Sequence, residues 1–283
     1  MKIGYTVWTW MREEFNSETP TEGAEAHFEE AVRSISYLGY ECIENFNFMV
    51  PIYEDRPDDL KALLKKHNLE FVNLYHTYHW DGTDETLQKW LDKGERTCRF
   101  LQEMGAKYLN MQGYTWHDAP YYRPDNKELL DIHVDAFTKM GAIAKKYGVQ
   151  ACLHPHGGTP MFSESSIDYF FSKADNDLVK LTLDTAHTTL GGMDPVYAIE
   201  KYRDLLVYVH LKDLDPDETN IKTRPNDRFC SLGQGFIDFR NVILALRRIG
   251  YDGVLCVEND NPRICNYQSA EFSREYIKSV LGM

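Results

Sequence analysis

The segment VKLTLDTAHTTLGG, residues 179–192, joins a short apolar run to polar and small residues. Its first part is rich in valine and leucine and too short for a helix, so it predicts a buried strand over 179–184. The strand ends in a carboxylate, Asp184, and His187 follows three residues later, before a pair of glycines.

Seven further apolar runs share this character and alternate with amphipathic stretches. The expected strands cover residues 2–7, 40–46, 69–75, 107–112, 149–154, 179–184, 205–211 and 253–259. The stretch 25–39 carries an apolar stripe with helical spacing and ends at Gly39, which suits a helix C-cap. Helices that end in the same way are expected before Gly105, Gly148 and Gly250. Eight strand-and-helix units of about 30 residues predict an α/β fold, a closed (β/α)₈ TIM barrel formed by a single domain over 1–283.

The alternative is an open, doubly wound parallel sheet. Such a sheet predicts a glycine-rich turn after its first strand, but the segment TVWTWMREEF, residues 6–15, contains no glycine. The longest irregular segment is 212–235, and a loop of that length in a compact domain is usually functional. Its Lys222, Arg224 and Arg228 could hold a phosphate, or they could simply be solvated charges on a loop.

Composition narrows the function classes. The 283 residues are 43% hydrophobic and 27% charged, with a net charge of −13, which disfavours nucleic acid and anionic membrane surfaces as partners. No apolar run reaches the roughly 20 residues of a membrane span, and the first residues do not resemble a signal peptide. Six cysteines without a C-x-x-C pair indicate free thiols, so we expect a cytoplasmic protein.

Potential metal ligands stand at the ends of the last four strands. They are His154 or His156, Asp184, His210 and Glu258. In a (β/α)₈ barrel the carboxyl ends of the strands meet at one mouth, so these side chains are expected to converge. Mixed nitrogen and oxygen ligands suit Mn²⁺, Fe²⁺, Co²⁺ or Zn²⁺. Taken alone, Asp184 is also explained as the N-cap of the next helix.

Other residues at the same mouth are candidates for substrate binding or catalysis. The substrate-binding candidates are His156, Glu44, His76 and Trp116. His187 could contact substrate or support a metal ligand, with structural packing as the alternative. Lys212 could donate a hydrogen bond to a negative oxygen that develops during the reaction. An aromatic side chain such as Trp116 suits a sugar ring, although packing explains it equally well.

The motifs at these strand ends resemble the xylose isomerase-like superfamily of TIM barrels, over essentially the whole chain. The motifs are LDTAH (183–187), VHLKD (209–213), GQGFIDF (233–239) and GYDGVLCVEND (250–260). Within that group, HPHGGT (154–159), LDTAHTTLGGMDP (183–195) and VENDNP (257–262) are most similar to inosose dehydratases. The group also holds sugar isomerases and epimerases and endonuclease IV.

The resemblance implies metal ligands at Asp184, His210 and Glu258 and one more on the fifth strand. Epimerases of the group carry glutamate at that last position, in patterns such as L-E-P-H, whereas this chain reads LHPH and has His154 there. Only Glu258 then remains of the two glutamates that act as paired bases in those epimerases. The dehydratases often have an acid shortly after the GT of the HPHGGT motif, and here Glu164 follows somewhat later.

From these features we expect a divalent-metal-dependent sugar isomerase or epimerase. It would abstract a proton next to the carbonyl of a ketose or keto-cyclitol through a metal-stabilised enediolate. Glu258 is the expected base, with His154, His156 or His187 as its partner. One alternative is a lyase of the inosose dehydratase type, and another is a non-catalytic sugar-binding barrel. Phosphodiester cleavage is disfavoured by the negative charge. Assembly into a homo-oligomer is compatible with the sequence.

Overall fold

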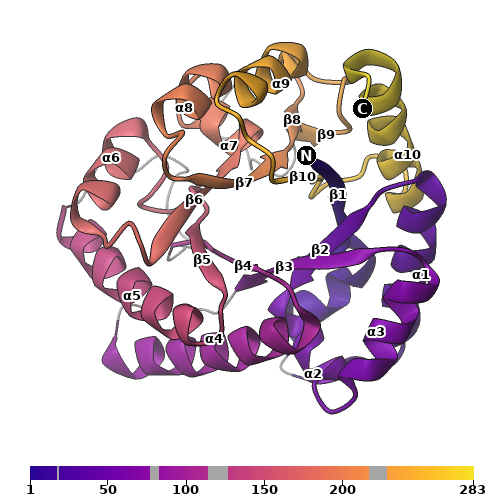
Figure 1. The fold of residues 1–283 in the computed structure, drawn as a ribbon, viewed down its shortest axis with the longest axis horizontal. Helices are drawn as coiled ribbons and strands as arrows, with labels where there is room; N and C mark the ends of the chain where they lie inside the picture. Colours follow the sequence, from indigo (N-terminus) through magenta and orange to yellow (C-terminus); the bar gives the residue numbers. More distant parts are fainter. Residues whose placement is uncertain (18, 77–82, 114–126, 217–227) are drawn as a thin grey trace.

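Eight parallel strands close into a barrel in the computed structural model, which describes residues 1–17, 19–76, 83–113, 127–216 and 228–283 (Figure 1). The order around the barrel is β1-β10-β7-β6-β5-β4-β3-β2. The strands are β1 (Lys2–Thr6), β2 (Cys42–Phe46), β3 (Glu70–His76), β4 (Tyr108–Met111), β5 (Gln150–Leu153), β6 (Val179–Asp184), β7 (Leu206–Leu211) and β10 (Val254–Val257). The predicted (β/α)₈ fold is confirmed, and each strand lies within its expected run or extends it by one residue.

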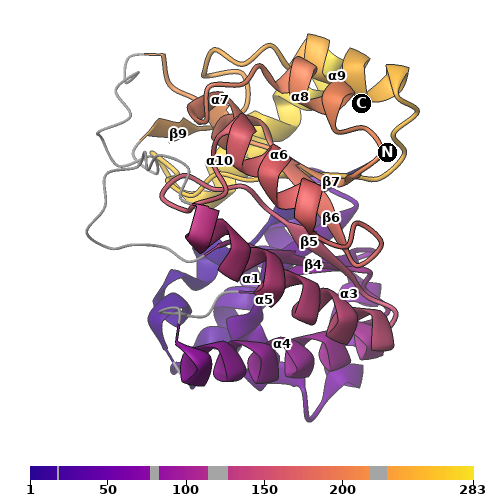
Figure 2. The same ribbon diagram turned by 90° about the vertical axis from the view of Figure 1, so that its left-hand side faces the viewer.

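Helices surround the barrel and connect successive strands (Figures 1 and 2). The α-helices are α1 (Ala24–Leu38), α2 (Val50–Tyr53), α3 (Pro57–Lys66), α4 (Asp84–Met104), α5 (Lys127–Lys146), α6 (Glu164–Lys173), α7 (Thr185–Leu190), α8 (Pro195–Lys201), α9 (Phe239–Arg248) and α10 (Asn266–Tyr276). Shorter helical segments are η1 (Trp8–Asn16), η2 (Asn47–Met49) and η4 (Ile277–Leu281). The C-caps of α1 and α4 are Gly39 and Gly105, both in the left-handed conformation that glycine adopts without strain.

Strand register brings the polar strand ends together. Asp184 pairs with His210 across β6 and β7, and Val257 pairs with Leu211, so Glu258 lies just beyond the end of β10. Apolar side chains fill the space between the barrel and its helices. Inside the barrel, however, the layer next to this end is polar, and it includes Glu44 and Asn73.

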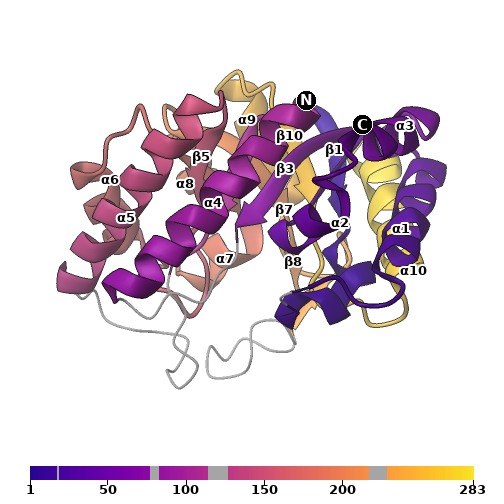
Figure 3. The ribbon, with the colours of Figure 1, turned by 90° about the horizontal axis from the view of Figure 1, so that it is seen from below.

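A short antiparallel hairpin follows β7. It pairs β8 (Asp213–Leu214) with β9 (Phe229–Cys230) and closes the base of the long segment 212–235. Figure 3 shows β8 and α7 at one end of the barrel and both chain termini at the other. Lys222 and Arg224, the phosphate-binding candidates, lie outside the described residues, whereas Arg228 is buried at the hairpin. No helix in the described ranges is long and apolar enough to cross a membrane.

Candidate active site at the barrel mouth

Four buried side chains from four successive strand ends converge at the barrel mouth. They are His154 after β5, Asp184 at the end of β6, His210 on β7 and Glu258 after β10, and one ligand atom from each lies within 4.8 Å of all the others. None of the four is more than 3% exposed. The sequence left His154 and His156 open as the ligand on the fifth strand, and the structure groups His154 with the other three.

The two carboxylate oxygens of Asp184 have different surroundings: one accepts a backbone hydrogen bond, and the other faces the cluster. Its Oδ1 accepts a hydrogen bond from the backbone N–H of His187 at 2.8 Å and so caps α7. Its Oδ2 lies 3.6 Å from His154 Nε2 and 3.9 Å from His210 Nδ1, and it accepts no hydrogen bond from any described residue. The N-cap and ligand interpretations of Asp184 are therefore compatible.

The two histidines present their inner ring nitrogens to each other, with His154 Nε2 3.0 Å from His210 Nδ1. Tyr75 donates its hydroxyl hydrogen to Gln112, so the Tyr75 oxygen, 2.9 Å from His154 Nδ1, accepts the N–H of that ring. On the other side, His210 Nε2 forms a hydrogen bond with Glu44 Oε2 at 3.1 Å. These hydrogen bonds assign both rings the tautomer that leaves a lone pair on the inner nitrogen.

The donor set suits a divalent cation. Two imidazole nitrogens face two carboxylates, and Asp184 Oδ2 and Glu258 Oε2 are buried without a well-aligned hydrogen bond within the described structure. Burial lowers the pKa of His210, but the charges of Glu44 and Glu258 outweigh burial and raise that pKa well above its ordinary value. The cluster thus attracts positive charge, which a bound cation would supply. Imidazole and carboxylate together favour Mn, Fe, Co or Zn over Ca²⁺.

Lys212 supplies a fixed positive charge beside the cluster. Its Nζ lies 2.9 Å from Glu258 Oε2, 3.0 Å from Asp260 Oδ2 and 3.4 Å from Asp184 Oδ2, and the side chain is 1% exposed. Burial lowers the pKa of Lys212, but the three carboxylates raise it further, so Lys212 stays an ammonium ion. Burial alone would raise the pKa of the Asp184 and Glu258 carboxyls, yet Lys212 and the histidines hold both pKa values well below the usual range.

Asp260 and Tyr75 were not among the residues predicted from the sequence. Burial raises the pKa of Asp260 to about 7, and Trp8 donates its indole N–H to this carboxylate at 3.3 Å. Asp260 follows Glu258 by two residues at the same strand end, and this position could have indicated from the sequence that it belongs to the site. Tyr75 lies inside an apolar run, so its contact with His154 has no signature in the sequence.

His156 and His187 form a pair of neutral rings at the edge of the cluster. Their ring centroids are 3.8 Å apart, and burial lowers the pKa of His156 to about 3. Gly157 donates its backbone N–H to His187 Nδ1 at 3.3 Å, which leaves the hydrogen on Nε2. That buried N–H has no hydrogen-bond partner among the residues described. His187 is therefore equipped to donate a hydrogen bond to a ligand at the mouth.

Two of the remaining predicted residues, Glu44 and His76, are buried and engaged within the fold. Glu44 sits beneath His210, inside the barrel. His76 places Nδ1 2.9 Å from the Asn47 amide nitrogen and Nε2 2.9 Å from the carbonyl oxygen of Trp90, so both of its ring nitrogens are used within the fold. These positions favour supporting roles over substrate contact. Trp116 lies outside the described residues.

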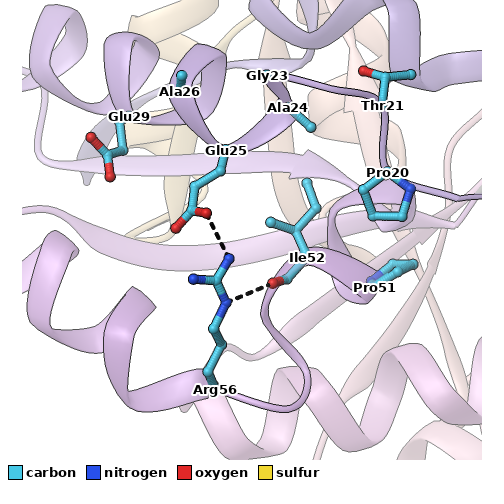
Figure 4. A pocket seen from close by; sticks show the side chains of 10 residues that line it. All are labelled: Pro20, Thr21, Gly23, Ala24, Glu25, Ala26, Glu29, Pro51, Ile52 and Arg56. Carbon is cyan, nitrogen blue, oxygen red and sulfur yellow. Dashed lines mark hydrogen bonds and ion pairs between the residues drawn. The ribbon is translucent and has the colours of Figure 1, made fainter.

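A hollow of about 630 Å³ lies elsewhere, between the start of α1 and the α2 segment (Figure 4). Its polar rim is largely self-paired, because Arg56 contacts Glu25 at 2.7 Å and the carbonyl oxygen of Ile52 at 3.2 Å. Its described lining contains neither histidine nor cysteine. The chemistry therefore points to the barrel mouth and not to this hollow.

Fold and site together define a (β/α)₈ barrel with a buried cluster of metal-ligand type at its carboxyl-terminal mouth. The model of the xylose isomerase-like TIM barrel family matches residues 32–279. An inosose dehydratase of Clostridium beijerinckii is 30% identical over 306 residues, covering 100% of this chain and 98% of that protein. An inosose dehydratase of Serratia proteamaculans is 30% identical over 294 residues, covering 95% of each chain. The chain belongs to the xylose isomerase-like TIM barrel family.

Among solved structures, the IolI protein with a bound zinc atom superimposes with a TM-score of 0.77 at 18% identity. The superposition covers 100% of this chain and 98% of that one. At this identity the likeness establishes the fold, in agreement with the family match.

Proposed function

We propose that this protein is a divalent-metal-dependent lyase that removes water from a keto-cyclitol by β-elimination. The main support for this proposal is the composition of the four-residue cluster. It contains a single glutamate, Glu258, and His154 occupies the position after β5. One carboxylate suffices for elimination, whereas the epimerase mechanism expected from the resemblance needs two glutamates. The relatives named inosose dehydratase also support the lyase alternative better than the isomerase or epimerase that we expected first.

His154, Asp184, His210 and Glu258 would hold Mn, Fe, Co or Zn. When bound, the cation supplies Lewis-acid polarisation of the substrate carbonyl. Glu258, kept ionised by Lys212, accepts the proton from the carbon next to that carbonyl. The electron pair of the broken C–H bond forms the C=C bond as the neighbouring C–O bond breaks. The same carboxyl group returns the proton to the departing hydroxide, so that water leaves.

Two further side chains orient the substrate. Lys212 donates a hydrogen bond to the oxygen on which negative charge develops. His187 donates its unpaired Nε2–H to a substrate hydroxyl, with His156 packed against its ring. We assign His154 as a ligand and not as an acid–base partner, because its Nε2 faces the cluster and its Nδ1 is bonded to Tyr75.

Metal content is the first test. We expect protein purified without chelator to hold close to one equivalent of Mn, Fe, Co or Zn by elemental mass spectrometry. An Asp184→Asn, Glu258→Gln double variant should lose it. Asp194 caps α8 as Asp184 caps α7, so Asp194→Asn controls for the loss of a helix cap and should keep the metal. If the wild type stays metal-free even after soaking with these ions, the mechanism fails.

The reaction class is tested with a keto-cyclitol in deuterium oxide. A lyase forms an unsaturated product that absorbs ultraviolet light, and the Asp184→Asn, Glu258→Gln variant should not form it. Exchange of the acidic carbon-bound hydrogen without that product would return the assignment to isomerase or epimerase. Binding without exchange or product would identify a sugar-binding barrel.

We also keep a cytoplasmic location as a proposal, supported by six cysteines that are all free. A single domain over 1–283 and assembly into a homo-oligomer are likewise proposals. Limited proteolysis and light scattering would test them.

A further inference from the structure

A polar layer buried inside the barrel lies directly beneath the metal-ligand cluster. Glu44 on β2 and Asn73 on β3 are both 0% exposed, and a charged or amide side chain is costly at such a position unless it is hydrogen-bonded. Asn73 Oδ1 accepts the backbone N–H of Asn110 at 3.2 Å, so its amide nitrogen must be the atom that faces Glu44. That nitrogen donates to Glu44 Oε2 at 2.8 Å. Glu44 therefore acts as a hydrogen-bond acceptor, as a carboxylate does.

The second partner of Glu44 is His210, one of the four cluster residues. His210 Nε2 forms a hydrogen bond with Glu44 Oε2 at 3.1 Å, and Oε1 of the same carboxylate lies 2.9 Å from Nε2 without hydrogen-bond alignment. In the neutral ring the hydrogen lies on Nε2, in this bond, and Nδ1 carries the lone pair. Nδ1 is the nitrogen that faces Glu258 at 3.0 Å and His154 at 3.0 Å.

We propose that Glu44 is a positioning residue that holds His210 in the tautomer and orientation needed to bind a metal. A carboxylate on the outer nitrogen of a histidine ligand also raises the basicity of the inner nitrogen, which strengthens the metal bond. Glu44 thus acts on the metal through His210 and replaces the substrate-contact role that the sequence assigned to it. The inference rests on the metal site of the proposed function.

The two histidine ligands are held unequally. The outer nitrogen of His154 donates to the neutral hydroxyl of Tyr75, whereas that of His210 donates to a carboxylate. A charged acceptor forms a hydrogen bond roughly twice as strong as a neutral one. His210 is therefore the firmer ligand, and removing the acceptor should weaken metal binding more at Glu44 than at Tyr75.

Glu44, His210 and Cys256 also lie close enough together to be considered as metal ligands themselves. A cation held there would have to use His210 Nε2, the atom that is engaged with Glu44. The separation of 3.1 Å between Nε2 and Glu44 Oε2 is that of a direct hydrogen bond. The structure thus favours Glu44 as the partner of a ligand and not as a ligand.

The test compares Glu44→Gln, which keeps the shape but removes the charge, with Tyr75→Phe and Thr182→Val. Thr182 lies in the same polar layer and donates to Asn110, whose amide nitrogen is 3.4 Å from His210 Nε2, so Thr182 reaches His210 only through a second residue. Zn²⁺ and Co²⁺ dissociation constants are measured by competition with a chromophoric chelator. We expect about 10–100-fold weaker binding in Glu44→Gln, a smaller loss in Tyr75→Phe, and a change of less than about threefold in Thr182→Val, with all variants folded by circular dichroism.

A second readout does not depend on metal. Nitrogen-15 shifts of the metal-free protein, recorded at a pH high enough that His210 carries a single ring hydrogen, should show that hydrogen on Nε2 in the wild type and a mixture of tautomers in Glu44→Gln. Unchanged tautomers together with unchanged metal affinity would overturn the positioning role. Two equivalents of metal, one of them lost in Cys256→Ala, would overturn it as well, because Glu44 would then be a ligand. A wild type that binds no metal would defeat the proposed function, while the tautomer measurement would still decide whether Glu44 orients His210.

Discussion

At the scale of single residues, Lys212 controls the charge at the barrel mouth. It is buried against three carboxylates and lies 4.4 Å over the ring of Phe229, which shields it from water. A cation among three acids removes the repulsion that would otherwise keep Asp184 and Glu258 from ionising together. The exposed Lys201 contacts two acids at similar distances, 2.7 and 2.6 Å, and therefore provides a matched comparison.

We expect Lys212→Met to lower the free energy of unfolding of the metal-free protein by about 3–5 kcal/mol, because it leaves buried carboxylates without their partner. Lys201→Met should cost less than about 1 kcal/mol, since water screens the surface pair. Denaturant unfolding at pH 8 measures both. We also expect turnover to fall about 100-fold or more in Lys212→Met if Lys212 stabilises an oxygen anion. Equal, small losses of stability in the two variants would refute the charge-balancing role.

At the scale of elements, Asp213 attaches the hairpin β8–β9 to the loop that follows it. Asp213 Oδ2 accepts the backbone N–H groups of Gly233 and Gly235, both at 2.9 Å. Its Oδ1 accepts those of Leu214 and Ile237 at 2.9 and 3.2 Å. A Cβ atom on Gly235 would lie 2.2 Å from Asp213 Oδ1, which explains the glycine in the GQG motif.

We expect Asp213→Asn to lower the free energy of unfolding by about 2–3 kcal/mol, because the amide nitrogen would face backbone donors that need an acceptor. The hairpin places Phe229 against Lys212 and against His187 at 5.3 Å, so turnover should fall as well. Asp238→Asn, at the N-cap of α9, is the control for an exposed capping carboxylate. Thermal unfolding and activity would be measured in parallel. An Asp213→Asn protein as stable and active as the Asp238→Asn protein would contradict this assignment.

At the scale of the whole molecule, buried neutral histidines couple stability to pH. Burial lowers the pKa of His76 to about 3 and that of His133 to about 4. In the unfolded chain both titrate near 6.5, so between pH 6.5 and about 4 the unfolded state binds protons that the native state does not. The stability from these groups is complete above pH 6.5 and is lost as the pH falls. The raised pKa of Asp260 acts in the opposite direction.

Replacing one histidine isolates its contribution. We expect the unfolding free energy of His133→Leu to depend less on pH than that of the wild type, by about 1.4 kcal/mol per pH unit between pH 6 and 5. Denaturant titrations across this range give both slopes. Parallel slopes would show that His133 takes up a proton in the folded protein. His133 contacts none of the four cluster residues in the described hydrogen bonds, so the comparison is independent of metal.

The sequence by itself determined the barrel and which polar side chains converge at its mouth. Apolar residues repeat with a period of two in strands and 3.6 in helices, so these patterns indicate which face of each element is buried. A chain of eight strand-and-helix units has few possible topologies. Because the strands of a (β/α)₈ barrel all point the same way, polar residues at their carboxyl ends had to meet. Asp184, His210 and Glu258 were therefore predictable, whereas the choice of His154 over His156 required the direction in which each side chain points.

Only the tertiary structure decided what supports the cluster. Glu44 and Tyr75 reach it from β2 and β3, and contacts between distant strands leave no local pattern in the chain. The hydrogen bond that a side chain makes depends on register and barrel closure, which set distances of a few ångströms between residues 79 and 166 positions apart. The side chains at the strand ends could thus be predicted from local patterns. Their hydrogen-bond partners could be identified only from contacts between distant parts of the chain.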